Sequence, residues 1–434
     1  MSERELYLLA RRRFLPLFVT QFFGAFNDNL FKNALVILIT YQLADKVAMN
    51  SQLLVTMAAG IFILPFFLFS ATAGQCAERF EKSGQIQYIK ILEIVLALLA
   101  TAGFLLETPV FLLIVLFLLG TQSTLFGPLK YSILPDHLSE DELIAGNGLI
   151  QMGTFTAILL GTIIGGLLIL MPFGKELVSG LLLTLAITGW LASRSIPRSE
   201  AAAPELSINP NFIAETYKII RHAAGRSEIA LPMMAISWFW LVGATYLAQY
   251  SNLAKSVLGA DEKVATLILT AFTVGIATGS ILCNRLVKGK ITARFVPLGA
   301  LGMSLFGIDL FLAINSAAPW TDGFMNTMQF LGSLPHLRIL MDLTLIAICG
   351  GVYIVPLYSL IQNRSQPEHR SRNIAALNIV NALFMVLSAV ATAILLKTGF
   401  DVPQVFLVLA VSNAIVAIYL HRKVRNNAFQ KNVT

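Results

Sequence analysis

Charge is scarce in this sequence. Only 13% of the 434 residues are Asp, Glu, Lys or Arg, whereas soluble domains carry about 25%. Hydrophobic residues make up 56% of the chain, and its mean hydropathy is +0.74. A soluble fold of this length has no interior large enough to bury so much apolar surface. The composition therefore excludes an ordinary soluble domain and predicts an integral membrane protein.

Cysteine and histidine are also scarce, and their placement excludes several kinds of site. The three cysteines lie far apart, so they form neither a disulfide framework nor a metal-ligand spacing. None of the five histidines is central to a long apolar run, and no nucleophile–base set accompanies them. We therefore expect no catalytic residue, no cofactor and no metal. The net charge of +7 is typical of basic residues retained on the cytoplasmic side of a membrane, so we expect no nucleic-acid partner.

Long apolar runs determine the predicted fold. A helix that crosses a bilayer needs roughly 20 mostly apolar residues. Twelve such runs occur, and none alternates with period two as a membrane strand would. They cover residues 14–43, 52–76, 86–106, 110–131, 143–171, 177–193, 229–258, 264–283, 294–316, 337–362, 374–396 and 402–421. The sequence therefore predicts an all-α membrane protein with about twelve transmembrane helices.

Basic residues set the orientation of these helices. One set of alternate loops, together with both termini, holds 24 of the 31 Lys and Arg residues. The opposite loops hold six, and Lys32 lies inside the first run. Loops rich in Lys and Arg stay in the cytoplasm. We therefore predict that both termini are cytoplasmic, which also requires an even number of spans.

The longest cytoplasmic connection divides the chain almost equally. Residues 194–228 contain Pro197, Pro204 and Pro210, followed by a short amphipathic stretch at 212–223. We therefore expect an N-terminal six-helix half at 1–193, a cytoplasmic linker at 194–228 and a C-terminal six-helix half at 229–434.

The two halves resemble each other at three places. "FGPLKYSIL" (126–134) matches "IVPLYSLIQ" (354–362), each at the end of a span. "ELIAGNGLI" (142–150) matches "RNIAALNIV" (372–380), each opening the next span. "GQCAERFEKSG" (74–84) matches "GSILCNRLVKGK" (279–290). All three pairs keep their order and their side of the membrane. This predicts two bundles in parallel repeat, as in many transporters.

The third pair carries a resemblance to a known family. "GQCAERFEK" resembles the cytoplasmic signature of the major facilitator superfamily, Gly-x-x-x-Asp/Glu-Arg-x-Gly-Arg/Lys-Arg/Lys, although its second glycine and one of its bases are replaced. Gly74, Glu78 and Arg79 match, and the second copy keeps Arg285. We interpret these four residues as a gate, since Gly74 permits close helix approach and Glu78 can pair with a basic group across the cytoplasmic seam. The alternative is an ordinary solvated loop.

A polar cluster interrupts the first span. "GAFNDNLFKN" (24–33) places Asp28 near the bilayer centre, and Lys32 follows one helical turn later. Ionisable groups at such a depth are costly and mark functional sites. We expect Asp28 and Lys32 to pair and to bind substrate, with Asn27 and Asn29 beside them. The helical stripe that carries them also holds Gln21, Gly24 and Leu35. The alternative is that these groups only join helices by hydrogen bonds.

Other polar residues are candidates for the same cavity. Lys130 follows a Gly-Pro pair at the end of the fourth span. We expect its side chain to bind substrate, and the alternative interpretation is that it extends to the membrane surface. Gln151 directly follows the repeated motif at 142–150, and Asn378 lies within the matching motif at 372–380. Lys90 and Glu93 are interpreted as a pair near the cytoplasmic end of the third span, whereas Asp309 is solitary in the ninth. Gln122, Asn147 and Asn381 are further polar candidates.

Together these motifs resemble the bacterial lysophospholipid transporter family of the major facilitator superfamily. "FGAFNDNLFK", "FGPLKYSIL" and "GNGL" carry the resemblance in the first half, and "VPLYSLIQ" and "NIAALNIVN" in the second. The start of the chain is similar to the transporter portion of fused transporter–acyltransferase proteins. The resemblance implies a flippase of the bacterial inner membrane that carries lysophosphatidylethanolamine and lysophosphatidylglycerol inward for re-acylation.

Two features of the sequence qualify this expectation. The chain has no acyltransferase His-x-x-x-x-Asp motif, so an acylating enzyme would be a separate chain. Close family members have a basic residue in the seventh span, and here Tyr246, Gln249 and Asn252 are the polar candidates instead. We expect a monomer whose partners are the lysophospholipid and the surrounding membrane lipids. A superfamily exporter of drugs, siderophores or other amphiphiles is the alternative function.

Overall fold

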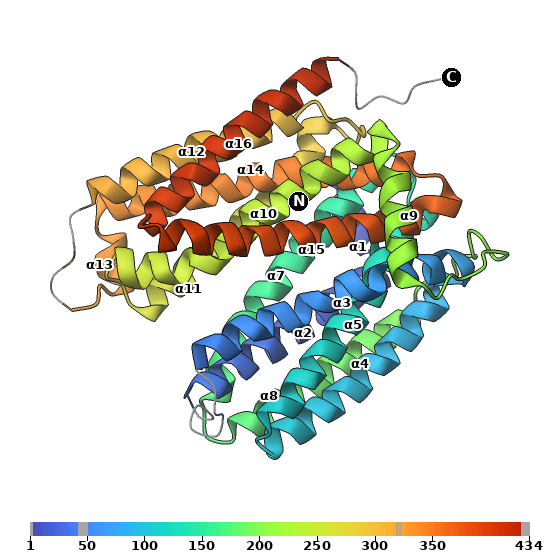
Figure 1. The fold of residues 1–434 in the computed structure, drawn as a ribbon, viewed down its shortest axis with the longest axis horizontal. Coiled ribbons are helices and arrows are strands. Elements are labelled where there is room, and N and C mark those ends of the chain that lie inside the picture. The colour runs from blue at the N-terminus through green and yellow to red at the C-terminus, as the bar shows by residue number, and fades with distance from the viewer. Residues whose placement is uncertain (1–2, 42–50, 318–319, 321–322, 427–434) are drawn as a thin grey trace.

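The computed structural model describes residues 3–41, 51–317, 320 and 323–426, and Figure 1 shows their arrangement. The described part of the chain is helical, with one isolated bridge between Ala260 and Met325. Its long helices are α2 (Leu15–Tyr41), α3 (Ser51–Arg79), α4 (Lys82–Leu105), α5 (Pro109–Ser132), α7 (Leu143–Ile169), α8 (Gly174–Ser193), α10 (Ser227–Asn252), α11 (Glu262–Val287), α12 (Val296–Ser316), α14 (Leu334–Arg364), α15 (Pro367–Lys397) and α16 (Val402–Arg425). The predicted fold class is confirmed, with helix ends that differ from the predicted runs by a few residues.

Four short helices lie outside these spans. They are α1 (Glu3–Leu9), α6 (Leu134–His137), α9 (Phe212–Ala224) and α13 (Thr327–Leu331). The amphipathic stretch expected in the linker corresponds to α9. The seventh predicted run does not stay α-helical to its end, because a π-helical turn, η2 (Leu253–Val257), follows α10.

Eleven of the long helices are long and apolar enough to cross a membrane, and α2 is the exception. It has 27 residues, which is sufficient length. Asn27, Asp28, Asn29, Lys32 and Asn33 lower its hydropathy. Because α2 packs along α7 and α8, we treat it as the twelfth span. The same polar cluster that marks α2 as a candidate functional helix also lowers its mean hydropathy below the value expected of a membrane span.

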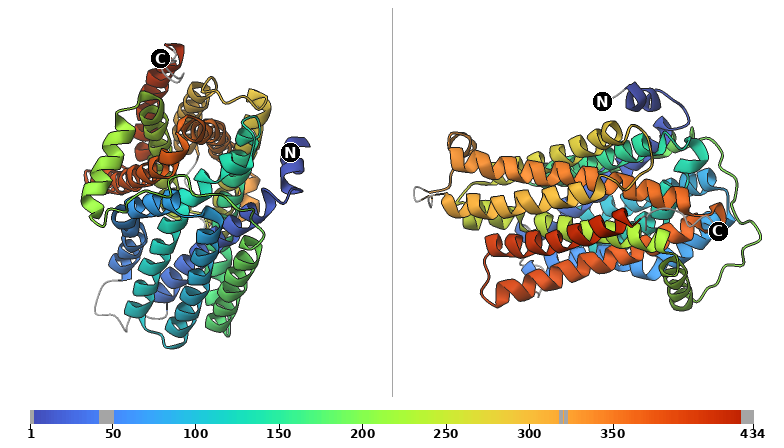
Figure 2. Two further views of the ribbon diagram at one scale, coloured as in Figure 1. Left: turned by 90° about the vertical axis from the view of Figure 1, so that its right-hand side faces the viewer. Right: turned by 90° about the horizontal axis from the view of Figure 1, so that it is seen from above.

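The long helices form two bundles. Helices α2 to α8 pack mainly against one another, as do α10 to α16. Figure 1 shows that the bundles converge near α9 and diverge toward the opposite end. The two termini of the described chain and α9 lie at the converging end (Figures 1 and 2), which the distribution of basic residues predicts to be the cytoplasmic end. Helices α3 and α15, and likewise α7 and α11, contact across the boundary.

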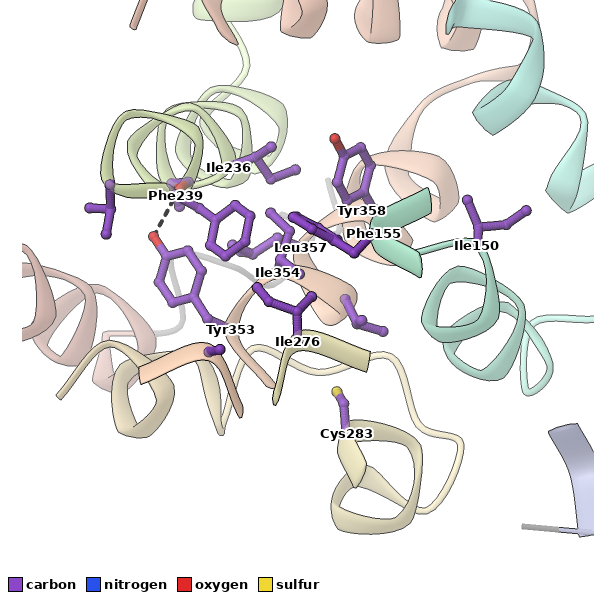
Figure 3. Close-up of a cluster of buried hydrophobic side chains, with 14 of the residues drawn as sticks. Ile150, Phe155, Ile236, Phe239, Ile276, Cys283, Tyr353, Ile354, Leu357 and Tyr358 are labelled. Carbon is purple, nitrogen blue, oxygen red and sulfur yellow. Dashed lines mark hydrogen bonds between the residues drawn. The ribbon is translucent and has the colours of Figure 1, made fainter. Parts of the chain in front are cut away.

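An aromatic cluster joins the two bundles. Phe155 of α7 meets Phe239 of α10 edge-on, with ring centroids 6.5 Å apart, and stacks on Trp240 at 6.2 Å. Tyr353 of α14 stacks on Phe239 at 6.3 Å and donates a hydrogen bond to the Ala235 carbonyl, at 2.9 Å (Figure 3). Such contacts contribute beyond their buried area, so they stabilise the interface between the bundles.

Close approach of helices depends on glycine at two equivalent positions. A Cβ added to Gly74 on α3 would lie 2.7 Å from the Cβ of Ala375 on α15. A Cβ added to Gly279 on α11 would lie 2.0 Å from the Ile348 carbonyl oxygen on α14. Real Cβ atoms do not approach so closely, so both motif glycines permit helix packing that no larger residue allows.

Candidate functional site

A cavity of about 400 Å³ lies between the two bundles. Helices α2, α3, α4, α5, α7, α10, α14 and α15 line it. Its polar lining consists of Gln21, Asp28, Asn29, Lys32, Lys90, Gln122, Ser123, Lys130, Tyr131, Thr154, Trp240, Tyr358, Asn378 and Asn381, and its larger apolar side chains are Phe62, Ile63, Phe66, Phe126, Ile158 and Met385. The cavity therefore has both a charged region and an apolar wall.

Asp28 lies in this cavity, but its hydrogen-bond partner is not the predicted one. The Ser123 hydroxyl of α5 donates to Oδ2 of Asp28. The Nζ of Lys32 instead lies 5.6 Å from the centroid of the Phe62 ring, and no ion pair joins it to a carboxylate in the described structure. The expected Asp28–Lys32 pair is therefore wrong. One helical turn brings the two residues to the same face, and the neighbouring helices decide which group each one meets.

The predicted stripe on α2 is largely reproduced. Gln21, Gly24, Asp28 and Lys32 all line the cavity, whereas Leu35 is fully buried in the packing of the N-terminal bundle. This follows from the period of the helix, which places positions three and four apart on one face.

The three asparagines of the cluster have different surroundings. Asn29 lines the cavity and donates to the Ala25 carbonyl of its own helix, at 2.8 Å. Asn27 is buried and is not part of the cavity lining, and its Nδ2 donates to Oε1 of Glu93 on α4, at 3.1 Å. Asn33 donates to the Thr162 carbonyl on α7, at 2.5 Å. Asn27 and Asn33 therefore join helices by hydrogen bonds, which was the alternative to substrate binding for the polar cluster.

Lys90 and Glu93 form a buried charged network that sequence reasoning underestimated. Their ion pair is 2.6 Å long between Nζ and Oε2, and both side chains are fully buried. Glu93 also accepts hydrogen bonds from Asn27 and, at 3.0 Å, from Gln122 of α5. The carboxylate thus connects α2, α4 and α5, and Lys90 reaches the cavity. The sequence feature that could have predicted this network is a pair of opposite charges three positions apart inside an apolar run.

Gly24 provides the space that Lys90 occupies, and this gives a prediction. A Cβ added at Gly24 would lie 2.4 Å from the Lys90 Nζ. We expect Gly24→Ala to displace that ammonium from Glu93 and to lower the free energy of unfolding by about 1–3 kcal/mol, as overpacking does. Gly189→Ala is the control, because its Cβ would meet nothing nearer than 3.7 Å. Thermal unfolding of the two variants in the same detergent, compared with wild type, measures the difference. Equal melting temperatures would contradict the assignment.

Lys130 belongs to the cavity rather than to the membrane surface. Its Nζ donates to the Thr154 hydroxyl on α7, at 3.3 Å, and lies 4.8 Å from the centroid of the Tyr131 ring. Gln151, one turn before Thr154, lies just outside the lining and donates to the Tyr131 hydroxyl, at 3.2 Å. The cavity and its edge therefore hold three ammonium groups, of Lys32, Lys90 and Lys130, against the carboxylates of Asp28 and Glu93.

The C-terminal bundle contributes neutral polar and aromatic groups. Asn378 lines the cavity as predicted, together with Asn381, Trp240, Tyr358 and Met385. The three polar candidates of the seventh span lie elsewhere: Tyr246 packs against Phe406 at a centroid distance of 4.7 Å, and Gln249 accepts a hydrogen bond from Asn252 at 2.8 Å. We therefore do not assign Tyr246, Gln249 or Asn252 to the site, because α10 turns Trp240 toward the cavity instead.

The cavity is closed toward the end that carries α9 by contacts between the bundles. Tyr131 and Tyr358 stack with ring centroids 4.3 Å apart. Beyond them Asn147 donates to Oε1 of Gln362, at 2.6 Å, and Gln362 donates to the Tyr131 carbonyl, at 3.0 Å. The repeated motifs at the ends of α5 and α14 and at the start of α7 therefore meet at the floor of the cavity.

Glu78 lies in the seam beneath this floor. It is fully buried, and it accepts hydrogen bonds from Nε of Arg372 on α15, at 2.5 Å, and from the Arg372 backbone N–H, at 3.0 Å. Arg79 makes no such bond, and its guanidinium lies 5.4 Å from the centroid of the Phe80 ring. Arg285 is exposed, while its neighbour Asn284 donates to Oε1 of Glu5 on α1, at 2.8 Å. Gly74 and Glu78 therefore contact α15 of the opposite bundle directly.

Asp136 is a second point of contact that sequence reasoning missed. It accepts bonds from Lys82 at 2.5 Å, from the Ser199 hydroxyl of the linker at 2.6 Å, and from Arg370 of α15 at 3.0 Å. Glu81 lies beside this group. Burial alone would raise the pKa of the Glu81 carboxyl, but hydrogen bonds from Ser83, Ser199 and Gly84 outweigh it and hold that pKa below its ordinary value. The linker is thus joined through Ser199 to the N-terminal bundle, and Asp136 connects the same group to Arg370 of the C-terminal bundle.

Asp309 lies outside the cavity. Two nitrogens of Arg338 on α14 donate to its carboxylate, and both side chains are partly exposed. The residue that was solitary in the sequence therefore has a partner from the next long helix. Among the residues that the structure describes, no three His, Cys, Asp or Glu side chains lie together as metal ligands would.

Comparisons with known proteins agree with this architecture. The profile of the Major Facilitator Superfamily matches residues 17–334. The chain is 28% identical to the lysophospholipid transporter LplT of Yersinia enterocolitica over 398 residues, which is 91% of this chain and 90% of that protein. It is also 28% identical to LplT of Yersinia pestis, over 92% of this chain and 90% of that protein.

Solved structures show the same fold at low sequence identity. The human organic anion transporter MFSD10 superposes with a TM-score of 0.75 at 13% identity, over 97% of this chain and 100% of that one. The fucose:proton symporter FucP of E. coli superposes with a TM-score of 0.67 at 14% identity, over 95% and 99% of the two chains.

Proposed function

Because the chain belongs to the major facilitator superfamily, we propose that it is a lysophospholipid transporter that works by alternating access between its two bundles. The observation that carries the proposal is the cavity, which combines charges of both signs with an apolar wall. A lysophospholipid carries a phosphate, in some cases an amine, and a single acyl tail. The similarity to curated lysophospholipid transporters over nine-tenths of the chain supports the same assignment.

The charged groups suit the two ends of such a headgroup. The Asp28 carboxylate accepts a bond only from Ser123 among the described residues, so it can accept further bonds from an ammonium group. Lys32 has an aromatic ring as its neighbour, and Lys130 has a hydroxyl. Neither ammonium is neutralised by a direct ion pair, and charge-assisted bonds to phosphate are strong. Lys90 is held by Glu93 and is already neutralised.

The apolar wall suits the tail. Phe62, Ile63 and Phe66 of α3 face the cavity together with Met385 of α15. Aromatic rings and a flexible thioether can adapt to a mobile chain. We therefore assign the headgroup to the α2–α5 side and the tail to the α3–α15 side.

Transport requires that the cytoplasmic seal opens. In this structure the Tyr131–Tyr358 stack and the Glu78–Arg372 and Asp136–Arg370 pairs close that end. Breaking these contacts while new ones form at the opposite end would expose the cavity to the cytoplasm. We assign the protein to the bacterial inner membrane with both termini cytoplasmic and with inward transport, and we expect a separate acyltransferase to consume its product. The headgroup range includes lysophosphatidylethanolamine and lysophosphatidylglycerol.

A reconstituted uptake assay tests the proposal. Proteoliposomes that contain the protein should accumulate labelled lysophosphatidylethanolamine and lysophosphatidylglycerol, and protein-free liposomes should not. Both lipids share the phosphate, so Lys130→Gln should lower the uptake of each by about tenfold, as expected for loss of a charge-assisted hydrogen bond. Lys397→Gln is the control, since Lys397 is exposed at the end of α15.

One result would contradict the proposed function, and another would contradict only the assignment of Lys130. Export of cationic drugs without lysolipid uptake would favour the alternative of a superfamily exporter. Lysolipid uptake that is unaffected by Lys130→Gln would retain the function and remove Lys130 from the site.

A further inference from the structure

The linker helix α9 has a position that transport alone does not require. Figure 1 shows that α9 runs across the ends of the spanning helices, and the left view of Figure 2 places it at the edge of the bundle. It packs on α3, α10 and α15 through Glu215, Ile219 and Ala223. A helix at the cytoplasmic ends of the spans and perpendicular to them lies parallel to the membrane surface.

The opposite face of α9 is both apolar and basic. Ile213 is 68% exposed and Tyr217 is 66% exposed, and Lys218 and Arg221 lie on the same exposed face. Arg226 follows at the end of the helix. Helices that lie in a membrane interface combine large apolar residues with Lys and Arg in this way.

A basic pocket adjoins this face. A cavity of about 100 Å³ between α9 and α15 is lined by Lys218, Ile219, His222, His369, Arg372 and Asn373. A more open hollow on its other side is lined by Tyr217, Lys218, Arg221, His222, Gly225 and Arg226. Neither lining includes a carboxylate. Within the described chain, Lys218 has one carboxylate neighbour, Glu215 at 3.7 Å, and Arg221 and Arg226 have none within ion-pair distance.

Two histidines lie among the cations of this pocket. His222 and His369 have ring centroids 4.7 Å apart, and Nδ1 of His369 lies 2.7 Å from Nη2 of Arg372. Burial lowers the pKa of His222, and the charges of Arg226, Arg372 and Lys218 lower it further. Cations gathered in this way repel one another, and an anion placed among them would remove that cost.

We propose that α9 and the first two turns of α15 form a binding site for the phosphate of an anionic phospholipid of the inner leaflet. Lys218, Arg221 and Arg226 contact the headgroup, and Ile213 and Tyr217 lie among the acyl chains. A lipid is the occupant, rather than a soluble phosphate, because the exposed apolar residues flank the basic pocket on a helix parallel to the membrane. The site is distinct from the transport cavity and adjoins Arg372, which holds Glu78 in the seam.

Native mass spectrometry of the detergent-purified full-length protein with added phosphatidylglycerol or phosphatidylcholine tests this site. We expect selective retention of phosphatidylglycerol. Each replacement of a Lys or Arg by Gln should weaken the binding of phosphatidylglycerol by about fivefold. The triple variant Lys218→Gln/Arg221→Gln/Arg226→Gln should therefore bind this lipid about 100-fold more weakly than wild type. The matched control is Lys288→Gln/Lys290→Gln/Arg294→Gln, which removes the same charge from the exposed connection between α11 and α12.

Further arms distinguish the possible occupants. Ile213→Ser/Tyr217→Ser should also weaken retention of phosphatidylglycerol, because a lipid contacts both parts of the surface. Displacement of the lipid by inorganic phosphate would overturn the proposal in favour of a soluble anion. Equal retention by wild type and the triple variant would also overturn it, and the exposed face of α9 would then be a surface for a protein partner.

Discussion

Asp28→Asn should reduce the uptake of lysophosphatidylethanolamine into proteoliposomes by about 100-fold, the loss expected when a charge-assisted interaction of about 3 kcal/mol is removed. Asparagine keeps the size of the side chain and can still meet Ser123, but it offers no charge to an ammonium group. It also leaves Lys32 and Lys130 without the nearby carboxylate of Asp28. Lysophosphatidylglycerol has no amine, so its uptake should fall less.

The control for this prediction is another carboxylate of the same protein. Asp309→Asn removes a charge that lies outside the cavity and is bound to Arg338, so uptake of both lipids should stay close to wild type. Unchanged uptake of lysophosphatidylethanolamine by Asp28→Asn, at normal protein levels, would exclude Asp28 from the site. Equal loss for both lipids would assign Asp28 to charge balance with the lysines instead of headgroup contact.

Glu78→Gln should open the cytoplasmic seam and lower uptake by at least tenfold. The Glu78 side chain is fully buried and Arg372 is 13% exposed. Removing one partner of such a pair leaves an uncompensated buried charge, at a cost of about 3–5 kcal/mol. The free energy of the conformation with the closed seam then rises relative to that of the open one. The transporter therefore no longer returns to the closed conformation in each cycle. Uptake and thermal unfolding measure the two consequences.

Two further variants test whether the unpaired charge of Arg372 causes the effect of Glu78→Gln. In Glu78→Gln/Arg372→Gln no charge is left unpaired, so this double variant should be more stable than Glu78→Gln alone. Arg79→Gln is the matched control, because the guanidinium of the neighbouring Arg79 lies over the Phe80 ring and forms no ion pair with a carboxylate among the described residues. Equal effects of Arg79→Gln and Glu78→Gln would show that the signature acts as a charged loop rather than as a gate.

Much of this molecule follows from local sequence. The period and length of the apolar runs are properties of a single helix in lipid, because each span satisfies its own backbone hydrogen bonds. The twelve predicted runs therefore correspond to the twelve long helices, and the amphipathic stretch of the linker corresponds to α9. The stripe of Gln21, Gly24, Asp28 and Lys32 faces the cavity for the same reason, since one helix determines which of its residues share a face.

The partners of these side chains come from other helices, so only the tertiary structure decides them. Asp28 meets Ser123, which is 95 positions away, and not Lys32 one turn along its own helix. The rotation of α10 brings Trp240 to the cavity and turns Tyr246 away from it. Arg372 and Arg370 become part of the seam only because α3 and α15 approach closely at Gly74. Helical period specifies which residues share a face, whereas packing against neighbouring helices decides where that face points.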